Sequence, residues 1–232
     1  MKRILALLLM LMLVLPHMIT LAAAAENFDM HLPIAYMDTK FTCGCSRGGS
    51  GTMIGRYGLI TAAHNLYCHV HGKPLKTCDF YFGAKSNGSY HYRYNGKFTY
   101  TVYDSFTHGY NAQNDIGFVI FETAVGEKTG WYASMAGSDH DLHEEYFNLL
   151  TYDFNRNLKG LFEIQYVLDP LQLYWQGQLD ATAGGPVAFT SDDYEFPTVV
   201  AVYTSMDNNG YSYGRRLTFD VIQDMRSAGA FN

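Results

Sequence analysis

The sequence lacks a run of basic residues and is acidic as a whole. Its 232 residues include 16 Lys and Arg against 22 Asp and Glu, which gives a formal net charge of −6 at pH 7 when histidine is neutral. A nucleic-acid partner requires a positive patch that neutralises its phosphates. We therefore expect no nucleic-acid partner.

Long hydrophobic runs are also absent after residue 25. Before it, the basic Lys2 and Arg3 are followed by an apolar run over 4–15 and by four alanines that end before Glu26. This order is typical of a secretory signal peptide with a small-residue cleavage site. An uncleaved membrane anchor is the alternative, but the apolar run is shorter than the ~20 residues of a spanning helix. We predict a secreted, extracellular protein without stable membrane insertion after cleavage.

Cysteines are few, and all four lie in the first half of the chain: Cys43, Cys45, Cys68 and Cys78. Export makes disulfides the default prediction for them. A zinc site that combines these cysteines with His69 and His71 is the alternative, but their spacing matches none of the usual zinc motifs. We therefore expect no metal and no cofactor.

Long helical periodicities and internal repeats are absent as well. After residue 25 the sequence is rich in Tyr, Phe, Thr and Gly, which is typical of an all-β fold of one domain or two small packed barrels. Asn95-Gly96 between alternating aromatic residues predicts a hairpin over 90–103. Apolar spacing after Thr218 predicts a helix over 218–227. We interpret the acidic segment 139–145 as an exposed loop, with a calcium site as the alternative.

The sequence does contain the parts of a hydrolytic site. The short apolar segment 58–63 ends on two alanines directly before His64, and such small residues leave an imidazole accessible at the rim of a sheet. Asp115 precedes a second apolar run and can accept a hydrogen bond from that imidazole. Gly184-Gly185-Pro186 forms a tight turn suited to a nucleophile, but the residue before it is Ala183.

Three motifs follow one another in the order histidine, aspartate, nucleophile turn: Thr61-Ala62-Ala63-His64, Asp115-Ile116 and Gly184-Gly185-Pro186. They resemble the motifs of the chymotrypsin-like (trypsin-like) serine proteases, most of all the bacterial glutamyl-endopeptidase-like branch. The order helps, because other triad folds use different orders. The resemblance covers about residues 51–225. It implies an all-β fold of two packed six-stranded antiparallel β-barrels with a C-terminal helix, and peptide-bond hydrolysis by a His-Asp-Ser triad.

The resemblance also implies a division of the chain. The expected parts are a signal peptide (1–25), an N-terminal arm or pro-segment (26–45), an N-terminal β-barrel with His64 and Asp115 (46–127) and a C-terminal β-barrel with the nucleophile turn and the closing helix (128–232). The expected partner is a peptide or protein substrate, and the expected oligomeric state is a monomer.

By the same resemblance, each site residue has a role. We expect His64 as general base, Asp115 as its orienting group, Ala183 at the nucleophile position, the amides of Ala181 and Ala183 as oxyanion hole, and Gln178 and Tyr203 at the substrate pocket. A methyl group cannot attack a carbonyl, and loss of a triad serine lowers turnover roughly a millionfold. The family usually has Gly where Ala181 stands. The Thr and His typical of glutamate specificity are absent, which favours a neutral or apolar side chain before the scissile bond.

Other residues need an interpretation beside these. In the family, a bridge commonly ties the strand before the histidine to the loop after it, which implies Cys45–Cys68 and leaves Cys43–Cys78. Ser50 lies in Gly48-Gly49-Ser50-Gly51, which looks like a nucleophile motif, but we interpret it as a structural turn before a strand. Thr182 as a substitute nucleophile is one residue off along its turn, so we expect its side chain to point away from His64.

Two functions fit this combination of motifs. The first is a secreted serine endopeptidase that is inactive as written because Ala183 replaces its nucleophile. The second is a natural pseudoprotease that keeps the cleft and binds a peptide or protein without cutting it. Intact His64 and Asp115 favour a recent or deliberate loss of the serine, whereas Ala181 and Thr182 indicate wider change.

Overall fold

The computed structural model describes most of the chain after residue 28. The described residues are 29, 31–142, 146–153, 155–156, 158–159, 162–163, 166–176, 182–189 and 197–232. The predicted signal peptide and the predicted site residues Gln178 and Ala181 lie outside them. Among the described residues, no helix combines the length and the apolar character needed to cross a membrane.

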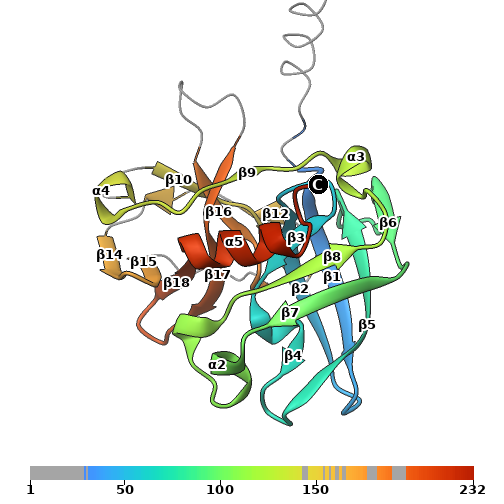
Figure 1. The fold of residues 1–232 in the computed structure, drawn as a ribbon, viewed down its shortest axis with the longest axis horizontal. Helices are drawn as coiled ribbons and strands as arrows, with labels where there is room; N and C mark the ends of the chain where they lie inside the picture. Colours follow the sequence, from blue (N-terminus) through green and yellow to red (C-terminus); the bar gives the residue numbers. More distant parts are fainter. Residues whose placement is uncertain are drawn as a thin grey trace, which may run out of the picture.

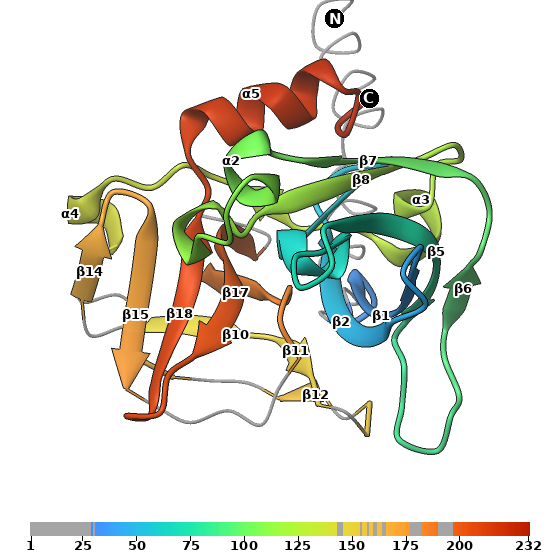
Figure 2. The same ribbon diagram turned by 90° about the horizontal axis from the view of Figure 1, so that it is seen from below.

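The first half of the chain forms one curled antiparallel sheet (Figure 2). Its strands are β1 (Ile34–Phe41), β2 (Ser46–Met53), β3 (Gly58–Thr61), β4 (Tyr67–Cys68), β5 (Lys73–Phe82), β6 (Tyr92–Tyr94), β7 (Phe98–Val102) and β8 (Gly117–Phe121). Their order is β4-β5-β1-β2-β3-β8-β7, and β6 also pairs with β5. Because alternate side chains of a strand face the same side, aromatic rings meet inside the curl. The ring centroids of Phe80 and Phe121, for example, are 4.9 Å apart.

The second half forms a similar sheet. Its strands are β9 (Ala133–Ser134), β10 (Tyr146–Leu149), β13 (Phe162–Glu163), β14 (Tyr166–Asp169), β15 (Gln172–Gln176), β16 (Pro186–Phe189), β17 (Thr198–Met206) and β18 (Tyr211–Arg216). The order is β13-β10-β16-β17-β18-β15-β14, and β9 pairs with β17 in parallel. A separate two-stranded sheet contains β11 (Thr151–Tyr152) and β12 (Leu158–Lys159). Trp175, Phe147 and Leu173 are fully buried in the core of the larger, eight-stranded sheet of this second half.

Short helices connect the strands, and one longer helix follows them. They are the 3-10 helices η1 (Ala63–Asn65) and η2 (Ala112–Asn114), and the α-helices α2 (Asp104–Thr107), α3 (Gly126–Thr129), α4 (Asp139–Leu142) and α5 (Phe219–Ser227). In Figure 1, α5 lies in front of both sheets, and the chain then continues toward β3. There the amides of Tyr57 and Gly58 donate to the carbonyl of Ala230 at 3.2 and 3.0 Å.

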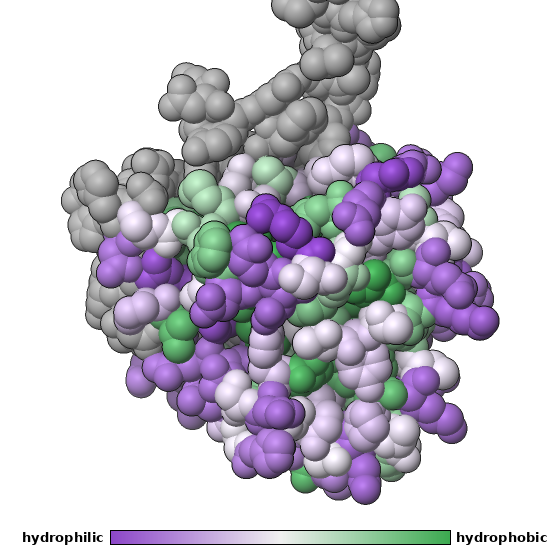
Figure 3. Space-filling model, in the orientation of Figure 1, coloured by the Kyte–Doolittle hydropathy of each residue, from purple (hydrophilic) through white to green (hydrophobic). Residues whose placement is uncertain are grey.

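A shared core joins the two sheets and α5. Ile60 and Phe118 of the first sheet, Val202 of the second, and Val221 and Met225 of α5 belong to one buried cluster. The predicted closing helix is therefore present, with Thr218 as its N-cap residue. Phe219, the first residue of α5, is 67% exposed and does not belong to this cluster. On the face seen in Figure 3, hydrophobic residues form only small separate groups between hydrophilic ones.

This arrangement confirms the predicted all-β fold of two packed barrel-like sheets with a C-terminal helix. Among the described residues each main sheet is divided into eight strands, where the resemblance implied six. The expected division also set residues 26–45 apart as an N-terminal arm or pro-segment. That part is corrected, because β1 lies between β2 and β5 and pairs with both along its length. The first sheet therefore begins near Ile34.

The predicted hairpin over residues 90–103 is wrong in its pairing. β6 and β7 flank Asn95-Gly96 as expected, but β6 pairs with β5 and β7 pairs with β8. Neither Asn95 nor Gly96 has a positive φ, which a tight hairpin turn of that type requires. Non-local strand pairing therefore prevails over the local turn signal.

Candidate active site

His64 lies where β3 leaves the first sheet. β3 is buried along its length between β2 and β8, and Ala62 and Ala63 after it are fully buried. His64 is the middle residue of η1, and its side chain is 13% exposed. Arg47 on β2 donates a hydrogen bond from its guanidinium to the His64 carbonyl at 3.1 Å. The imidazole of His64 is therefore partly accessible.

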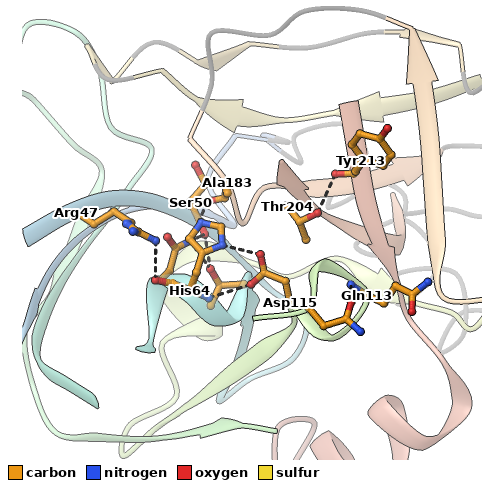
Figure 4. Close-up of polar contacts among 11 residues, drawn as sticks. Arg47, Ser50, His64, Gln113, Asp115, Ala183, Thr204 and Tyr213 are labelled. Atoms are coloured by element: carbon orange, nitrogen blue, oxygen red, sulfur yellow. Dashed lines mark hydrogen bonds and ion pairs between the residues drawn. The ribbon is translucent and has the colours of Figure 1, made fainter. Parts of the chain in front are cut away.

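Asp115 faces His64 from the end of η2, two residues before the start of β8. Its carboxylate accepts two hydrogen bonds from His64, from the backbone amide to Oδ1 at 2.9 Å and from ring atom Nδ1 to Oδ2 at 2.6 Å (Figure 4). The Asp115 side chain is fully buried. A carboxylate at Nδ1 holds the proton on that nitrogen, which leaves Nε2 as the free base of the ring.

The nucleophile turn has a backbone that only glycine accommodates. Gly184 has φ +102°, and a Cβ built on it would lie 1.9 Å from the carbonyl oxygen of Ser50. A Cβ on Gly185 would lie 2.5 Å from the Cβ of Thr151. The Gly184 amide donates to the Tyr203 carbonyl at 2.7 Å, and the Tyr203 amide donates to the Gly185 carbonyl at 2.9 Å. The turn is therefore fixed between β2 and β17.

Ala183 is joined to the first sheet through its carbonyl oxygen. The Ser50 amide donates to this oxygen at 2.8 Å, and the Asn65 side-chain amide donates to it at 2.9 Å. Asn65 is the residue after His64, and Ser50 and Ala183 lie beside His64 in Figure 4. The structure thus brings the three predicted triad positions, His64, Asp115 and Ala183, to one place.

Ser50 is a structural residue, but not in the way the sequence indicated. It lies within β2 and not in a turn before a strand, so that detail is corrected. Its hydroxyl is fully buried, 2.7 Å from Thr182 Oγ1 and 3.0 Å from Thr151 Oγ1, and it accepts from the Tyr152 amide at 3.1 Å. These bonds cross between the sheets and occupy the hydroxyl.

Thr182 takes part in the same buried network. Its hydroxyl donates to the Tyr152 carbonyl at 2.8 Å, and its amide donates to the same carbonyl at 2.6 Å. The hydroxyl is therefore held between the Ser50 hydroxyl and the Tyr152 carbonyl. This arrangement favours the interpretation of Thr182 as a structural residue.

Tyr203, predicted to line the substrate pocket, has a mostly buried ring. It is 3% exposed, and its ring centroid lies 6.1 Å from that of Trp175. Burial raises the pKa of its phenol, so the ring stays neutral around neutral pH. The position that the structure assigns to Tyr203 is a wall of the second core, with its backbone holding the nucleophile turn.

Two residues that position the site were missed by the sequence analysis. Arg47 holds the His64 carbonyl, and Asn65 binds both Thr61 Oγ1 at 3.0 Å and the Ala183 carbonyl at 2.9 Å. The only available signal for Asn65 was its place directly after His64. Arg47 had none, because its contact depends on the pairing of β2 with β3.

The predicted disulfides are absent from the structure, in which all four cysteines are free. Cys78 is buried on β5, and its thiol donates to the carbonyl of Asp79 at 3.7 Å. The other three lie together in a different place, beside His71. The predicted pair Cys43–Cys78 is unbonded, and Cys78 does not belong to the group of three cysteines around Cys43. The predicted pair Cys45–Cys68 is close but unbonded.

The acidic segment with the alternative of a calcium site is described only in part. Asp139 forms an ion pair with Arg216, with Oδ1 2.5 Å from the guanidinium. Residues 143–145 lie outside the described residues.

No protein-family model and no curated protein sequence matches this chain. Solved structures do match. A Glu endopeptidase has 16% identity and a TM-score of 0.71, with 87% of this chain and 92% of that one covered. A thermostable serine protease from an extremophilic microorganism has 12% identity and a TM-score of 0.73, with 87% and 99% covered. The protease Anisep from Arthrobacter nicotinovorans has 14% identity and a TM-score of 0.69, with 86% and 95% covered.

This chain has the chymotrypsin-like serine protease fold. The resemblance predicted from the three motifs is thereby confirmed at the level of the fold. In this chymotrypsin-like chain, the first sheet supplies His64 and Asp115, and the second supplies the turn with Ala183.

Proposed function

We propose that this chain is a secreted serine endopeptidase in architecture, with His64 and Asp115 as general base and orienting group, whose hydrolysis is lost because the nucleophile position holds Ala183. One observation carries the proposal. The His64 Nδ1–Asp115 Oδ2 pair at 2.6 Å is assembled with its carboxylate fully buried, while its proposed partner position across the sheets carries a methyl group.

The proposed chemistry follows from a serine at position 183. His64 Nε2 takes the hydroxyl proton as the oxygen attacks the scissile carbonyl, and the amides of residues 181 and 183 stabilise the oxyanion. His64 then gives the proton to the leaving amine, and water repeats the sequence on the acyl-enzyme. Asp115 stabilises the imidazolium in both halves. With Ala183 the first bond cannot form, so the turnover falls by roughly a millionfold.

The proposed substrate is a peptide or protein held between the two sheets. Gln178 and the buried Tyr203 are proposed to contribute to the pocket for the side chain before the scissile bond, which we expect to be neutral or apolar. We propose secretion after removal of residues 1–25, and a monomer in solution. Sedimentation of the secreted chain tests the last point, because a dimer would double its mass.

The decisive experiment is Ala183→Ser in the chain without residues 1–25. We expect this variant to cut members of a mixed peptide library and to be labelled by a fluorophosphonate at position 183. The unmodified chain and the double variant Ala183→Ser/His64→Ala serve as controls and should do neither. If the folded Ala183→Ser variant neither cuts nor labels, the proposed site is wrong.

A second function, a non-catalytic peptide-binding module, is favoured by one observation. Thr182, beside the nucleophile position, is locked into the buried network with Ser50 and Tyr152, so the turn is stable without a serine. The unmodified chain should then bind library peptides with affinities that Ala183→Ser does not change. Isothermal titration with cleavage-resistant peptides checks this, and an absence of binding would leave only the first function.

A further inference from the structure

Two turns of the first sheet lie side by side at one end. The first, residues 42–45, connects β1 to β2 and carries Cys43 and Cys45. The second, residues 69–72, connects β4 to β5 and follows Cys68. They meet because β1 pairs with β5, and the Thr42 amide donates to the Pro74 carbonyl at 3.1 Å where that pairing ends. Residues far apart in the sequence are thus brought together by strand pairing.

Three sulfur atoms and one imidazole nitrogen converge between these turns. The Sγ atoms of Cys43, Cys45 and Cys68 and a ring nitrogen of His71 all lie within 4.8 Å of one another. His71 Nδ1 is 3.4 Å from Cys45 Sγ and 3.5 Å from Cys68 Sγ. We propose that Cys43, Cys45, Cys68 and His71 bind one zinc ion.

The distances fit a tetrahedral zinc site. Zinc–sulfur bonds of about 2.3 Å and zinc–nitrogen bonds of about 2.0 Å give edges of about 3.5 Å between sulfur and nitrogen and about 3.8 Å between two sulfurs. Both sulfur–nitrogen distances of His71 match the first value, at 3.4 and 3.5 Å. The widest separation in the group, at most 4.8 Å, is about 1 Å beyond the second.

The backbone of both turns is arranged to present these side chains. Gly44, between the first two cysteines, has φ +90°, and Gly72, directly after His71, has φ +60°. These left-handed conformations favour glycine. The Gly44 amide donates to the Phe41 carbonyl at 3.0 Å, and the His71 amide donates to the Cys68 carbonyl at 3.3 Å. Each turn is therefore closed on itself, with its donor atoms facing the other turn.

A disulfide explains this group less completely than a metal does. One bridge among three thiols uses two of them and leaves the third thiol and the imidazole without a role. Cys78 cannot complete a second bridge, because it is buried elsewhere on β5. Four donors of the types that zinc prefers, in the number that a closed structural site requires, account for all four residues.

Zinc at this position would stabilise the surroundings of His64. Cys68 follows His64 by four residues, and Cys45 precedes Arg47, which donates to the His64 carbonyl. A closed site with four protein ligands has no open position for substrate, so the proposed ion is structural and does not take part in hydrolysis. The proposal is also independent of the residue at position 183.

The test uses the chain without residues 1–25, purified under reducing conditions and loaded with zinc or cobalt(II) alone. We expect one bound ion per chain by mass spectrometry, and with cobalt the visible absorption bands of a tetrahedral thiolate site. Cys45→Ser and His71→Ala should each weaken binding by more than the roughly 100-fold that loss of an outer partner costs. Cys78→Ala and His69→Ala are matched controls, one cysteine and one histidine outside the group, and should keep the ion.

The unmodified chain also decides the question without variants, which matters if a ligand variant does not fold. Removal of zinc with a chelator should lower its melting temperature, and added zinc should restore it. The proposal is overturned if the folded chain shows no tetrahedral cobalt bands. It is equally overturned if peptide mapping of the exported protein finds Cys43, Cys45 or Cys68 in a disulfide and no metal is bound.

Discussion

The first sheet contributes a complete pair to the site, His64 with Asp115 at 2.6 Å, whereas the second contributes a turn with the required backbone and a methyl group at Ala183. The pair depends on side chains that touch each other. The turn depends on backbone atoms, with Gly184 and Gly185 fitted against the first sheet and β17. The comparison indicates that the support of the turn does not depend on a hydroxyl at position 183.

The largest effect should come from breaking the pair in the first sheet. In the Ala183→Ser background, Asp115→Asn should lower kcat by roughly ten-thousandfold, as in another Ser-His-Asp protease, which is about 5 kcal/mol of transition-state stabilisation. Asp115 accepts from both the amide and Nδ1 of His64. An asparagine can accept only one of these bonds and must donate in the other, which places the ring proton on Nε2.

Steady-state kinetics on a cleaved library peptide measures this effect, with melting temperature as the control for folding. A fall of less than tenfold would show that Asp115 does not orient the base.

A substitution in the turn of the second sheet should lower the stability of the fold and not act on catalysis directly. Gly184→Ala combines a left-handed φ of +102° with a Cβ 1.9 Å from the Ser50 carbonyl. We expect the free energy of unfolding to fall by roughly 3 kcal/mol or more. Gly210→Ala is the matched control, because Gly210 has φ +84° and no atom within 4 Å of an added Cβ, so it should cost only about 1–2 kcal/mol.

Denaturant unfolding of both variants separates the backbone strain of a left-handed residue from the steric clash of the added Cβ with Ser50. Equal losses at positions 184 and 210 would mean that the close approach of the turn to β2 is not rigid.

The joint between the sheets should show a smaller effect. Ser50→Ala removes a buried hydroxyl bonded to Thr182, Thr151 and the Tyr152 amide. Leaving such groups unpaired costs about 1–3 kcal/mol of stability. In the Ala183→Ser background the same change should preserve fluorophosphonate labelling, because Ser50 has no part in the chemistry. The exposed Ser105→Ala should leave stability unchanged, and loss of labelling in a folded Ser50→Ala variant would contradict this assignment.

The smallest effect is expected in the second sheet at Asp207, which lies in the turn between β17 and β18. The amides of Tyr211 and Asn209 and the hydroxyl of Tyr213 donate to the Asp207 carboxylate and lower its pKa. Because the folded pKa is below the unfolded one, this stabilisation is present above about pH 4 and is lost as the pH falls through the folded pKa.

Asp207→Asn should therefore lower the melting temperature slightly at pH 7 and make no difference at strongly acid pH. Thermal scans against pH test this, with Asp104→Asn on α2 as the exposed control. A constant difference at all pH values would exclude the carboxylate as its source.

The fold and the main site residues were predictable where the signal was local. His64 and Asp115 follow or precede apolar strands, and Gly184 stands in a glycine turn, so short segments identified all three. The hairpin at Asn95-Gly96 was predicted wrongly, because each of its strands finds a better partner elsewhere.

What depends on distant pairing was not predictable. The gathering of Cys43, Cys45, Cys68 and His71 needs β1 against β5, and spacing along the sequence gives no register. Asn65 and Ser50 likewise gain their roles only when Ala183 of the other sheet reaches them. Gln178 and Ala181 lie outside the described residues and stay predictions.

The carbonyl oxygen of Ala183, held by the Ser50 amide and the Asn65 side chain, has a genetic consequence. Every amino acid has the same backbone carbonyl, so these hydrogen bonds between the sheets do not depend on the side chain at position 183. A single base change converts any alanine codon into a serine codon. Under the proposed function, a lineage with this fold can therefore pass from a non-cutting to a cutting form in one mutational step, without first having to rebuild the contact between the sheets.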